Sequence, residues 1–322
     1  MGDFTRLTRT DWLGLADRFY ARLDGTLASL NGSNWERVTP YLGFRARDVL
    51  AHMASTIPVN FREVLDRALA GNPAAPPEFD TFARNTREVA RRRATPPAAL
   101  LTEFRRELDA IMGMYRRMSD ADWQKPAWFF VGRVRVRSLF LVQFADNVFH
   151  ERDLLMANRR WTGGLDPEHA APLVDWFLRE FRPAMFRPDR VPGLRATMRY
   201  RLGGPAGGEW TLTVADGACR VEAGAPARAD VTLEADAEEL VAAGQARAAP
   251  WIGQLALAMS WMPRGRREDV VARITGMASL GRALALRRIR VSGNRAIATR
   301  LNRAFWHFWE RTEMTAENIK KG

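Results

Sequence analysis

The residues best suited to chemistry lie in the segment from Ser138 to Asn158, which is expected to be a helix. At helical spacing an acid and an imidazole, Asp146 and His150, share one face with Asp153. The same face carries Leu139, Val142 and Phe149, which indicates that it points into a core. Buried polar groups are costly unless they are paired or bind a metal. The Asp146–His150 pair is therefore either a satisfied pair in the core or part of a metal site.

A second histidine with the same character is His52. It lies in an expected helix over about 45–69, on a face shared with Val49, Met53 and Thr56, and is predicted to point inward. If His52 meets Asp146 and His150, two helices supply three protein ligands and leave open positions on a metal. The sequence leaves a metal-free core trio as the alternative.

The remaining candidate groups are expected to have structural roles. Glu151 lies off the inward face and is expected to be solvated, and His169 is expected at the surface or at a helix start. His307 is expected to pack among aromatic side chains, and Cys219 to be a small core residue on a strand. The chain has no nucleophile elbow, no P-loop and no strand-linked dinucleotide fingerprint. The sequence by itself assigns no catalytic or cofactor-contacting residue.

Composition narrows the class of protein. The chain has 322 residues, of which 47% are hydrophobic, as expected for a folded protein of two domains. Its net charge is +12, but the arginines are spread along the chain without a nucleic-acid motif, so no nucleic-acid partner is expected. The apolar runs 138–144 and 250–262 are shorter than the roughly 20 residues that span a bilayer. A single cysteine and an opening unlike a signal peptide complete the prediction of a cytoplasmic protein without a stable membrane anchor.

Helical periodicity dominates the first part of the chain. Segments 11–30, about 45–69, about 97–118 and about 168–181 carry apolar residues at helical spacing, and Pro58 is expected to kink or end the first half of the second. A short extended piece is expected at 129–136. Together with 138–158, and joined by short connections, these segments predict an antiparallel helical bundle.

Beyond a proline-rich linker near residue 190, alternation replaces helical spacing. Strands are expected at 197–202 and 210–214 around a Gly-rich hairpin turn, then at 219–221, 230–236 and 288–293, with helices at 237–244 and after 294. The predicted fold class is α+β, with the bundle over residues 1–188 and an antiparallel α+β domain over 189–322. A helical insert at about 250–286 is expected to be buried, or to form the lid or wall of an apolar tunnel.

Several of these stretches resemble a known family. Trp35 precedes the turn at Thr39 and Pro40, then Phe44 and the run from Arg47 to His52, and Asp146, His150 and Asp153 follow in the later helix. Together they resemble the DinB-like metalloenzyme superfamily, specifically its mycothiol-dependent maleylpyruvate isomerase branch. Residues 230–244 and 288–305 resemble the sterol-carrier-type domain that often follows that bundle.

The resemblance implies that His52, Asp146 and His150 are metal ligands. It also implies that Asp153 does not bind the metal itself, but contacts one of the ligating side chains or forms a salt bridge. Zinc is the first choice for this ligand set, and nickel and iron stay open. The metal is expected to bind the sulfur of a small-molecule thiol, mycothiol in actinobacteria, as a thiolate. The thiolate would isomerise, or add to, a small electrophilic substrate that carries a carboxylate. The expected partners are that thiol and that substrate, and the chain is expected to be a monomer or homodimer.

The sequence also departs from the family pattern. The acid ligand is usually glutamate, so Asp146 is one methylene shorter, and Arg45 stands where a capping Ser or Thr is usual. The segment 250–286 is longer than the usual connection. Two other functions therefore stay open: a carrier of apolar ligands that uses the C-terminal domain, and a biosynthetic metalloenzyme without thiol chemistry. The arginine that would hold a substrate carboxylate is not identified.

Overall fold

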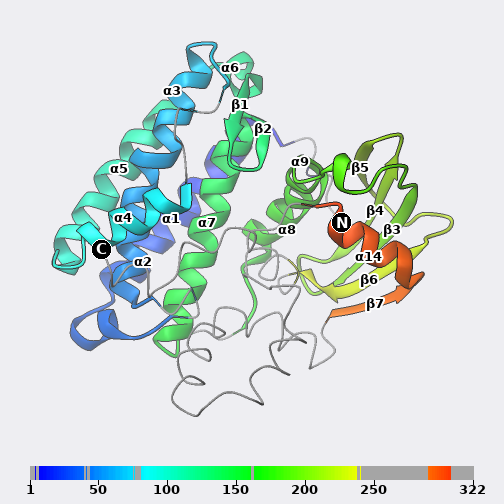
Figure 1. Cartoon of the computed structure of the whole chain (residues 1–322). Helices are drawn as coiled ribbons and strands as arrows, with labels where there is room; N and C mark the ends of the chain where they lie inside the picture. Colours follow the sequence, from blue (N-terminus) through cyan, green and yellow to red (C-terminus); the bar gives the residue numbers. More distant parts are fainter. Residues whose placement is uncertain are drawn as a thin grey trace, which may run out of the picture. The chain divides into compact units, whose positions relative to one another are not determined.

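The computed structural model describes residues 4, 7–39, 41, 44–74, 76, 81–160, 163–237, 240 and 289–305. Contacts within the chain divide these residues into two compact units, one over Leu7–Gly163 and one over the described residues from 164 to 305. The first unit is helical apart from one short hairpin, and the second is built on a sheet (Figure 1). The α+β class predicted from the sequence is confirmed.

The helical unit is a bundle of long helices that carries a two-stranded hairpin. Its elements are α1 (Arg9–Ala28), η2 (Gly32–Glu36), α2 (Ala46–Thr56), η3 (Ile57–Arg62), α3 (Glu63–Leu69), α4 (Thr81–Arg91), α5 (Pro97–Arg117), α6 (Asp120–Gln124), β1 (Pro126–Phe129), β2 (Gly132–Arg135) and α7 (Val136–Ala157). Helix α1 begins with a capping box, in which Thr8 and Asp11 bind each other's backbone N–H groups. The helices expected from periodicity are all present, whereas α4 was not expected.

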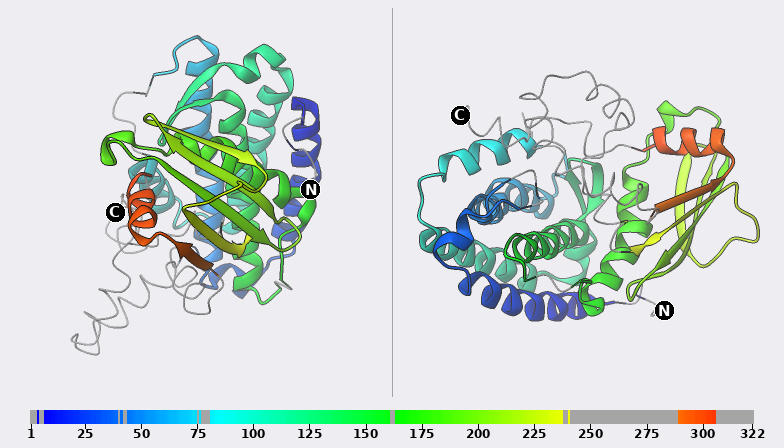
Figure 2. Two further views of the ribbon diagram at one scale, coloured as in Figure 1. Left: turned by 90° about the vertical axis from the view of Figure 1, so that its right-hand side faces the viewer. Right: turned by 90° about the horizontal axis from the view of Figure 1, so that it is seen from below.

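Helix α7 is the centre of the helical unit. It is buried on nearly all sides, because α1, α2, α3, α6 and the hairpin all contact it. In the right-hand view of Figure 2, α2 and α7 lie next to each other with their axes seen end-on. Fully buried apolar side chains of α1, α2, α5 and α7 form the core, among them Phe19, Leu23, Leu50, Leu100, Ile111, Leu139 and Phe144. The segment that the sequence analysis placed at the centre, Ser138 to Asn158, therefore forms the central helix of this unit.

The helix that carries His52 continues without a break from α2 through η3 into α3, but its middle is π-helical. Pro58 lies at the start of that π-helical stretch. Proline has no N–H to donate and its ring crowds the preceding turn, so a wider turn accommodates it. The disturbance predicted at Pro58 is thus present as a local widening rather than as the end of the helix.

The second unit contains a five-stranded sheet. Its elements are α8 (Pro167–Trp176), η4 (Phe177–Phe181), α9 (Arg182–Ala184), η5 (Pro188–Arg190), β3 (Ala196–Gly203), β4 (Gly208–Ala215), β5 (Ala218–Ala223), β6 (Val231–Asp236), β7 (Ile289–Gly293) and α14 (Arg295–Arg303). The strand order is β5-β4-β3-β6-β7. Asp216 and Gly217 both have positive φ, as a tight hairpin turn between β4 and β5 requires.

The sheet is antiparallel except at its centre, where β3 and β6 run parallel. Strands β3, β4 and β5 reverse direction twice, so β5 runs in the direction of β3. The chain then crosses over residues 224–230 and adds β6 on the far side of β3 in that same direction. Alternation located these strands correctly, but the wholly antiparallel sheet predicted from the sequence is wrong at this pair, because alternation carries no information on strand direction.

The division into units differs from the sequence-based boundary between residues 188 and 189, because α8 packs with the sheet. The buried Trp210 of β4 donates its indole N–H to Oδ1 of Asp175 in α8 at 2.9 Å. The π-helical η4 and the short α9 that continue α8 both contact β5. The helix expected at 168–181 is therefore present, but it belongs with the strands.

Some predicted elements fall outside the described residues. These are the helical insert at 250–286 with its apolar run 250–262, nearly all of the helix at 237–244, His307 and the end of the last helix. Among the described residues, no helix combines the length and the apolar character needed to cross a bilayer.

Candidate metal centre

The three residues singled out in the sequence come together between α2 and α7. Asp146 lies between two imidazoles: its Oδ2 is 3.6 Å from Nε2 of His52, and its Oδ1 is 3.4 Å from Nε2 of His150. One ligand atom from each of the three lies within 4.8 Å of the other two. The two rings are 5.0 Å apart and nearly perpendicular, at 83°. The predicted convergence of His52, Asp146 and His150 is therefore seen in the structure.

The imidazoles of this trio are buried and incompletely paired. His52 and His150 are 3% and 2% exposed, whereas the side chain of Asp146 is 28% exposed. Among the described residues, no partner makes a well-aligned hydrogen bond to Nδ1 of His52 or to either ring nitrogen of His150, although Asp146 and Asp153 lie 3.4 Å and 3.7 Å from the latter. Buried polar atoms in folded proteins almost always find a partner, so each exception needs an explanation. A cation bound through the Nε2 atoms that face Asp146 would account for Nε2 of His150, but not for the two Nδ1 atoms.

Electrostatic effects shift the pKa values of the two histidines in opposite directions. Burial lowers the pKa of His52, so its ring is neutral near pH 7. Burial also opposes the charge on His150, but the carboxylates of Asp146 and Asp153 outweigh it and raise the pKa of His150 to about 9. Burial would raise the pKa of Asp146, yet the two imidazoles hold it below the ordinary range. The trio therefore presents one carboxylate, one neutral imidazole and one imidazole whose proton a metal must displace.

The donor set and spacing fit a divalent cation. Ligand atoms about 2.0–2.1 Å from a tetrahedral zinc are roughly 3.3 Å apart. The oxygens of Asp146 lie 3.4 Å and 3.6 Å from the histidine nitrogens, close to that value before any adjustment. Two imidazoles and one carboxylate suit zinc, and also iron and nickel. The more exposed Asp146 marks the side on which other ligands can approach.

Asp153 lies behind His150, one turn further along α7. Its Oδ2 is 3.7 Å from Nδ1 of His150, and its Oδ1 is 3.4 Å from Nη2 of Arg152. A carboxylate behind a ligating histidine fixes the orientation of the ring and makes it a stronger donor. Asp153 thus lies where it can pair with His150, and its expected role beside a metal ligand stays a prediction.

An aromatic side chain missed in the sequence also borders the trio. The ring centroid of Tyr41 is 4.4 Å from that of His150 and 5.6 Å from that of His52. The buried Phe44 packs against the other side of Tyr41, at 5.4 Å. Tyr41 follows the Thr39-Pro40 turn in a loop, where no periodicity indicates the direction of a side chain. The one sequence signal that could have pointed to Tyr41 is the Thr-Pro turn before it, because that turn leads into the helix of His52.

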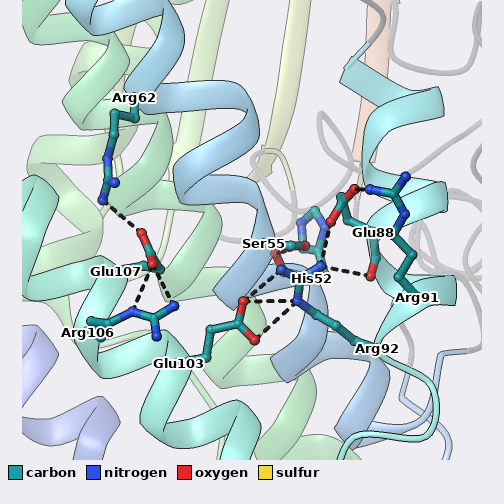
Figure 3. A network of polar contacts seen from close by, with 9 residues as sticks. All are labelled: His52, Ser55, Arg62, Glu88, Arg91, Arg92, Glu103, Arg106 and Glu107. Atoms are coloured by element: carbon teal, nitrogen blue, oxygen red, sulfur yellow. Dashed lines mark hydrogen bonds and ion pairs between the residues drawn. The ribbon is translucent and has the colours of Figure 1, made fainter.

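Hydrogen bonds and ion pairs fix the helix of His52. Ser55 donates its hydroxyl to the backbone carbonyl of His52. Figure 3 shows this pair together with ion pairs that join Arg62 of η3 to Glu107 of α5, and Arg92, just after α4, to Glu103 of α5. At the start of α2, the carboxylate of Asp48 accepts the backbone N–H of Arg45 at 3.0 Å. Glu36 binds the guanidinium of Arg45 at 2.5 Å. Arg45 thus replaces a capping Ser or Thr without leaving the helix start unsupported.

Two family models match this chain, and one of them covers the trio. The model of the mycothiol maleylpyruvate isomerase N-terminal domain matches residues 16–155, which include all three members of the trio. The SCP-2 sterol transfer family model matches residues 181–251. The two-domain resemblance stated from the sequence is confirmed.

Two solved structures share the fold of this chain. Two structures of a mycothiol-dependent maleylpyruvate isomerase, one of them a histidine-to-alanine variant, are 15% and 14% identical to this chain. Each covers 76% of this chain and 92% of its own, with a TM-score of 0.51. YfiT from Bacillus subtilis is 16% identical and covers 47% of this chain and 86% of its own, with a TM-score of 0.39. No curated protein sequence matches the chain significantly.

The prediction that Glu151 of α7 is solvated is wrong. It is 4% exposed rather than solvated, because α1 packs on that side of α7. Arg22 donates to both of its carboxylate oxygens, at 2.7 Å and 3.2 Å, and Thr26 donates to one of them at 3.1 Å. The residue next to His150 therefore ties α7 to α1.

The other expected structural residues lie in the sheet unit. His169 is in the first turn of α8, as one of the two alternatives expected, but it is buried. Its Nδ1 lies 3.1 Å from Oδ2 of Asp166, the N-cap residue. Cys219 is partly buried on β5, and burial raises the pKa of its thiol to about 12. Cys219 is therefore protonated at neutral pH and a poor nucleophile.

Proposed function

We propose that the protein is a metal-dependent enzyme that uses a low-molecular-weight thiol, mycothiol, against a small electrophilic substrate. The observation that carries the proposal is the convergence of His52, Asp146 and His150, two of them buried, in the segment that matches the mycothiol maleylpyruvate isomerase N-terminal domain. Among the described residues, Nε2 of His150 has no well-aligned hydrogen bond, so it can bind a metal. The reaction is an isomerisation through a reversible adduct, or a net thiol transfer. Relatedness to the isomerase supports the enzyme class, and the substrate is a proposal drawn from it.

In this proposal His52, Asp146 and His150 hold the metal, with zinc as first choice. Three protein ligands leave at least one position free, as in catalytic rather than structural zinc sites. His52 and His150 are held rigidly by the buried surfaces of α2 and α7, so the ligand set is organised before the metal arrives. Asp153 orients the ring of His150 through Nδ1.

The metal supplies a positive charge that lowers the pKa of a bound thiol, so that a thiolate nucleophile exists at neutral pH. The protein supplies no such nucleophile of its own, because Cys219 is the sole cysteine and its pKa is about 12. Burial of both imidazoles keeps bulk water from their ring nitrogens. The thiol therefore has to come from a second small molecule. Its sulfur would take the open position on the metal.

Thiol binding to the cobalt-loaded protein tests the proposal. Titration of the Co²⁺ form with mycothiol is expected to produce an intense near-ultraviolet band from sulfur coordination, along with a change in the visible bands. S-methylated mycothiol, which has the same sugar and amide groups but no ionisable thiol, is the matched control and should leave the spectrum unchanged. An unchanged spectrum with mycothiol itself, in a protein whose cobalt is bound, would contradict thiol chemistry.

A metalloenzyme without thiol chemistry is the second candidate, and Asp146 favours it. The carboxylate is one methylene shorter than the glutamate usual in this branch, which places a bound metal closer to α7. In that case the metal activates water or polarises a substrate carbonyl. A cobalt spectrum that responds to pH but not to mycothiol would support this candidate.

A further inference from the structure

Tyr41 forms a cluster of rings with the two histidines of the trio. Its ring centroid lies 4.4 Å from that of His150, edge to face at 72°, and 5.6 Å from that of His52. The two imidazoles are 5.0 Å from each other. Rings at these separations are in contact, so each member of the cluster touches the other two. Tyr41 therefore packs across the junction of α2 and α7, where both imidazoles meet.

The loop that carries Tyr41 is closed on itself by hydrogen bonds. The backbone N–H of Thr39 donates to the carbonyl of Phe44 at 2.7 Å, and the N–H of Phe44 donates to the carbonyl of Tyr41 at 2.9 Å. The Thr39 hydroxyl donates to the Phe44 carbonyl at 2.9 Å. Outside this pair, Val38 and Arg45 form an antiparallel bridge. The buried ring of Phe44 packs edge to face on Tyr41, so backbone and side-chain contacts together fix where the Tyr41 ring lies.

Exposure differs among the side chains of this centre. Tyr41 is partly exposed, whereas His52 and His150, which it contacts, are 3% and 2% exposed. A partly exposed ring that touches two buried rings covers them from solvent on its own side. Asp146, with 28% of its side chain exposed, is the member of the trio that solvent reaches. The trio therefore has a side covered by an aromatic ring and an open side at its carboxylate.

The side chains around a metal centre decide how many water molecules reach it. Zinc held by three protein ligands takes a fourth ligand, and sometimes a fifth where space allows. The carbon atoms of an aromatic ring offer no ligand atom, so water does not approach through a ring that is packed on the ligating imidazoles. If that ring is removed, the space it leaves lies beside polar atoms and is large enough to hold water. A ring in this place therefore limits the coordination number of the metal.

We infer that Tyr41 is a positioning residue that closes one side of the metal centre to water and leaves a single open position, beside Asp146. The role belongs to the ring of Tyr41, which touches both imidazoles, and not to its hydroxyl. The inference rests on the metal binding by the trio in the proposed function, but not on the thiol chemistry. It holds equally for a metalloenzyme that activates water, because either reaction needs one exchangeable ligand on the metal.

The visible absorption spectrum of the full-length protein loaded with Co²⁺ tests the inference, because cobalt with few ligands absorbs more strongly than cobalt with six. Tyr41→Ala should lose visible absorption intensity as water joins the metal, and its Co²⁺ affinity should fall about tenfold or more. Tyr41→Phe keeps the ring and should match the wild type in both quantities.

Phe130→Ala is the matched control. Phe130 is also a partly exposed ring in a turn, packed on a buried ring, that of Phe129, at 4.3 Å. It lies before the first residue of α7, Val136, which is roughly 21 Å along the helix from His150. This variant loses as much aromatic surface as Tyr41→Ala, and it should leave the cobalt spectrum and the cobalt affinity unchanged.

The possible failures of this inference and of the metal assignment can be told apart. A wild type that binds no cobalt would overturn both. A wild type that binds cobalt, beside a Tyr41→Ala variant with the same spectrum and affinity, would overturn the inference alone. Equal losses in Tyr41→Phe would show that the hydroxyl acts instead of the ring, and equal losses in Phe130→Ala would show a general loosening of the helical unit. If Tyr41→Ala does not fold, Tyr41→Val takes its place, and an unchanged spectrum there would contradict the inference.

Discussion

Among the described residues, two clusters bring a carboxylate and an imidazole close enough to hold an ion, and they differ in how the other atoms of their side chains are used. One is His52, Asp146 and His150 in the helical unit. The other is Asp166, Glu168 and His169 at the start of α8. The first draws on two helices nearly a hundred residues apart and leaves buried imidazole nitrogens without a hydrogen bond. A metal ion held by the trio, as proposed above, would occupy Nε2 of His150.

The second cluster follows from local helix capping. Asp166 is the N-cap of α8, and its Oδ1 accepts the backbone N–H of Glu168 at 3.0 Å. Its Oδ2 lies 3.1 Å from Nδ1 of His169, three residues on. Carboxylates at helix starts satisfy the N–H groups that lack a partner there. Closeness of a carboxylate and an imidazole does not by itself indicate a metal site. A metal site is indicated when the side chains come from distant parts of the chain and a buried nitrogen among them lacks a hydrogen bond.

The largest expected effect comes from removing the central carboxylate. Asp146→Ala should weaken metal binding by more than the roughly 100-fold that loss of an outer partner costs. It should also lower the pKa of His150 towards its ordinary value, because Asp146 is the strongest influence raising it. Metal titration and NMR of the histidine ring would measure both. Unchanged affinity would remove the distinction between the two clusters, since Asp146 would then contribute no more than Asp166.

Metal binding should depend on pH through His150. In the metal-free protein its pKa is about 9, so below that pH the metal must displace one proton from the ring. Asp146 is already deprotonated and His52 already neutral at pH 7, so neither adds a proton. Affinity should rise about tenfold per pH unit from 7 towards 9 and then level off. Calorimetry in buffers of different ionisation enthalpy should detect release of about one proton per metal at pH 7; no release would contradict the assignment.

Removing the carboxylate behind His150 should have a smaller effect. Asp153→Asn keeps the size of the side chain and removes its charge, and metal affinity is expected to fall by roughly 10–100-fold. The protein should remain folded, as judged by circular dichroism. Asp166→Asn makes the same chemical change in the capping cluster and serves as control, with no effect on metal affinity. Equal behaviour of the two variants would show that Asp153 does not act on the trio.

The smallest effect is expected in the capping cluster. Asp166→Ala should destabilise the protein by about 1 kcal/mol, the typical contribution of an N-cap side chain. Metal content should be unaffected. A thermal unfolding series with and without added zinc would separate the two quantities, and a loss of zinc-dependent stabilisation in this variant would identify α8 as a metal site after all.

The sequence predicted the trio because periodicity identifies the inward face of a helix. His52 and His150 lie on such faces in long helices, where the signal is strongest. The same argument failed for Glu151, since it assumes one buried side whereas α7 is buried on nearly all sides. Tyr41 could not be placed, because loop residues follow no periodic pattern.

Helix α4 was missed because polar contacts, rather than an apolar stripe, hold it in place. Asn85 of α4 accepts a hydrogen bond from the buried Thr56 at 3.1 Å, and Asn60 donates to Thr56 at 2.9 Å. At its end, Arg92 binds Glu103 of α5 at 2.7 Å (Figure 3). The parallel pairing of β3 with β6 and the association of α8 with the sheet were equally hidden, since both depend on contacts between distant segments.

Metal analysis of the purified protein, beside matched His52→Ala and His169→Ala variants, tests the central claim most directly. Each variant loses one buried imidazole, but from different clusters. The account predicts about one divalent metal per chain in the wild type and in His169→Ala, and none in a folded His52→Ala. A folded wild type that stays metal-free after zinc is offered, or a His52→Ala variant that keeps its metal while His169→Ala loses it, would contradict the account.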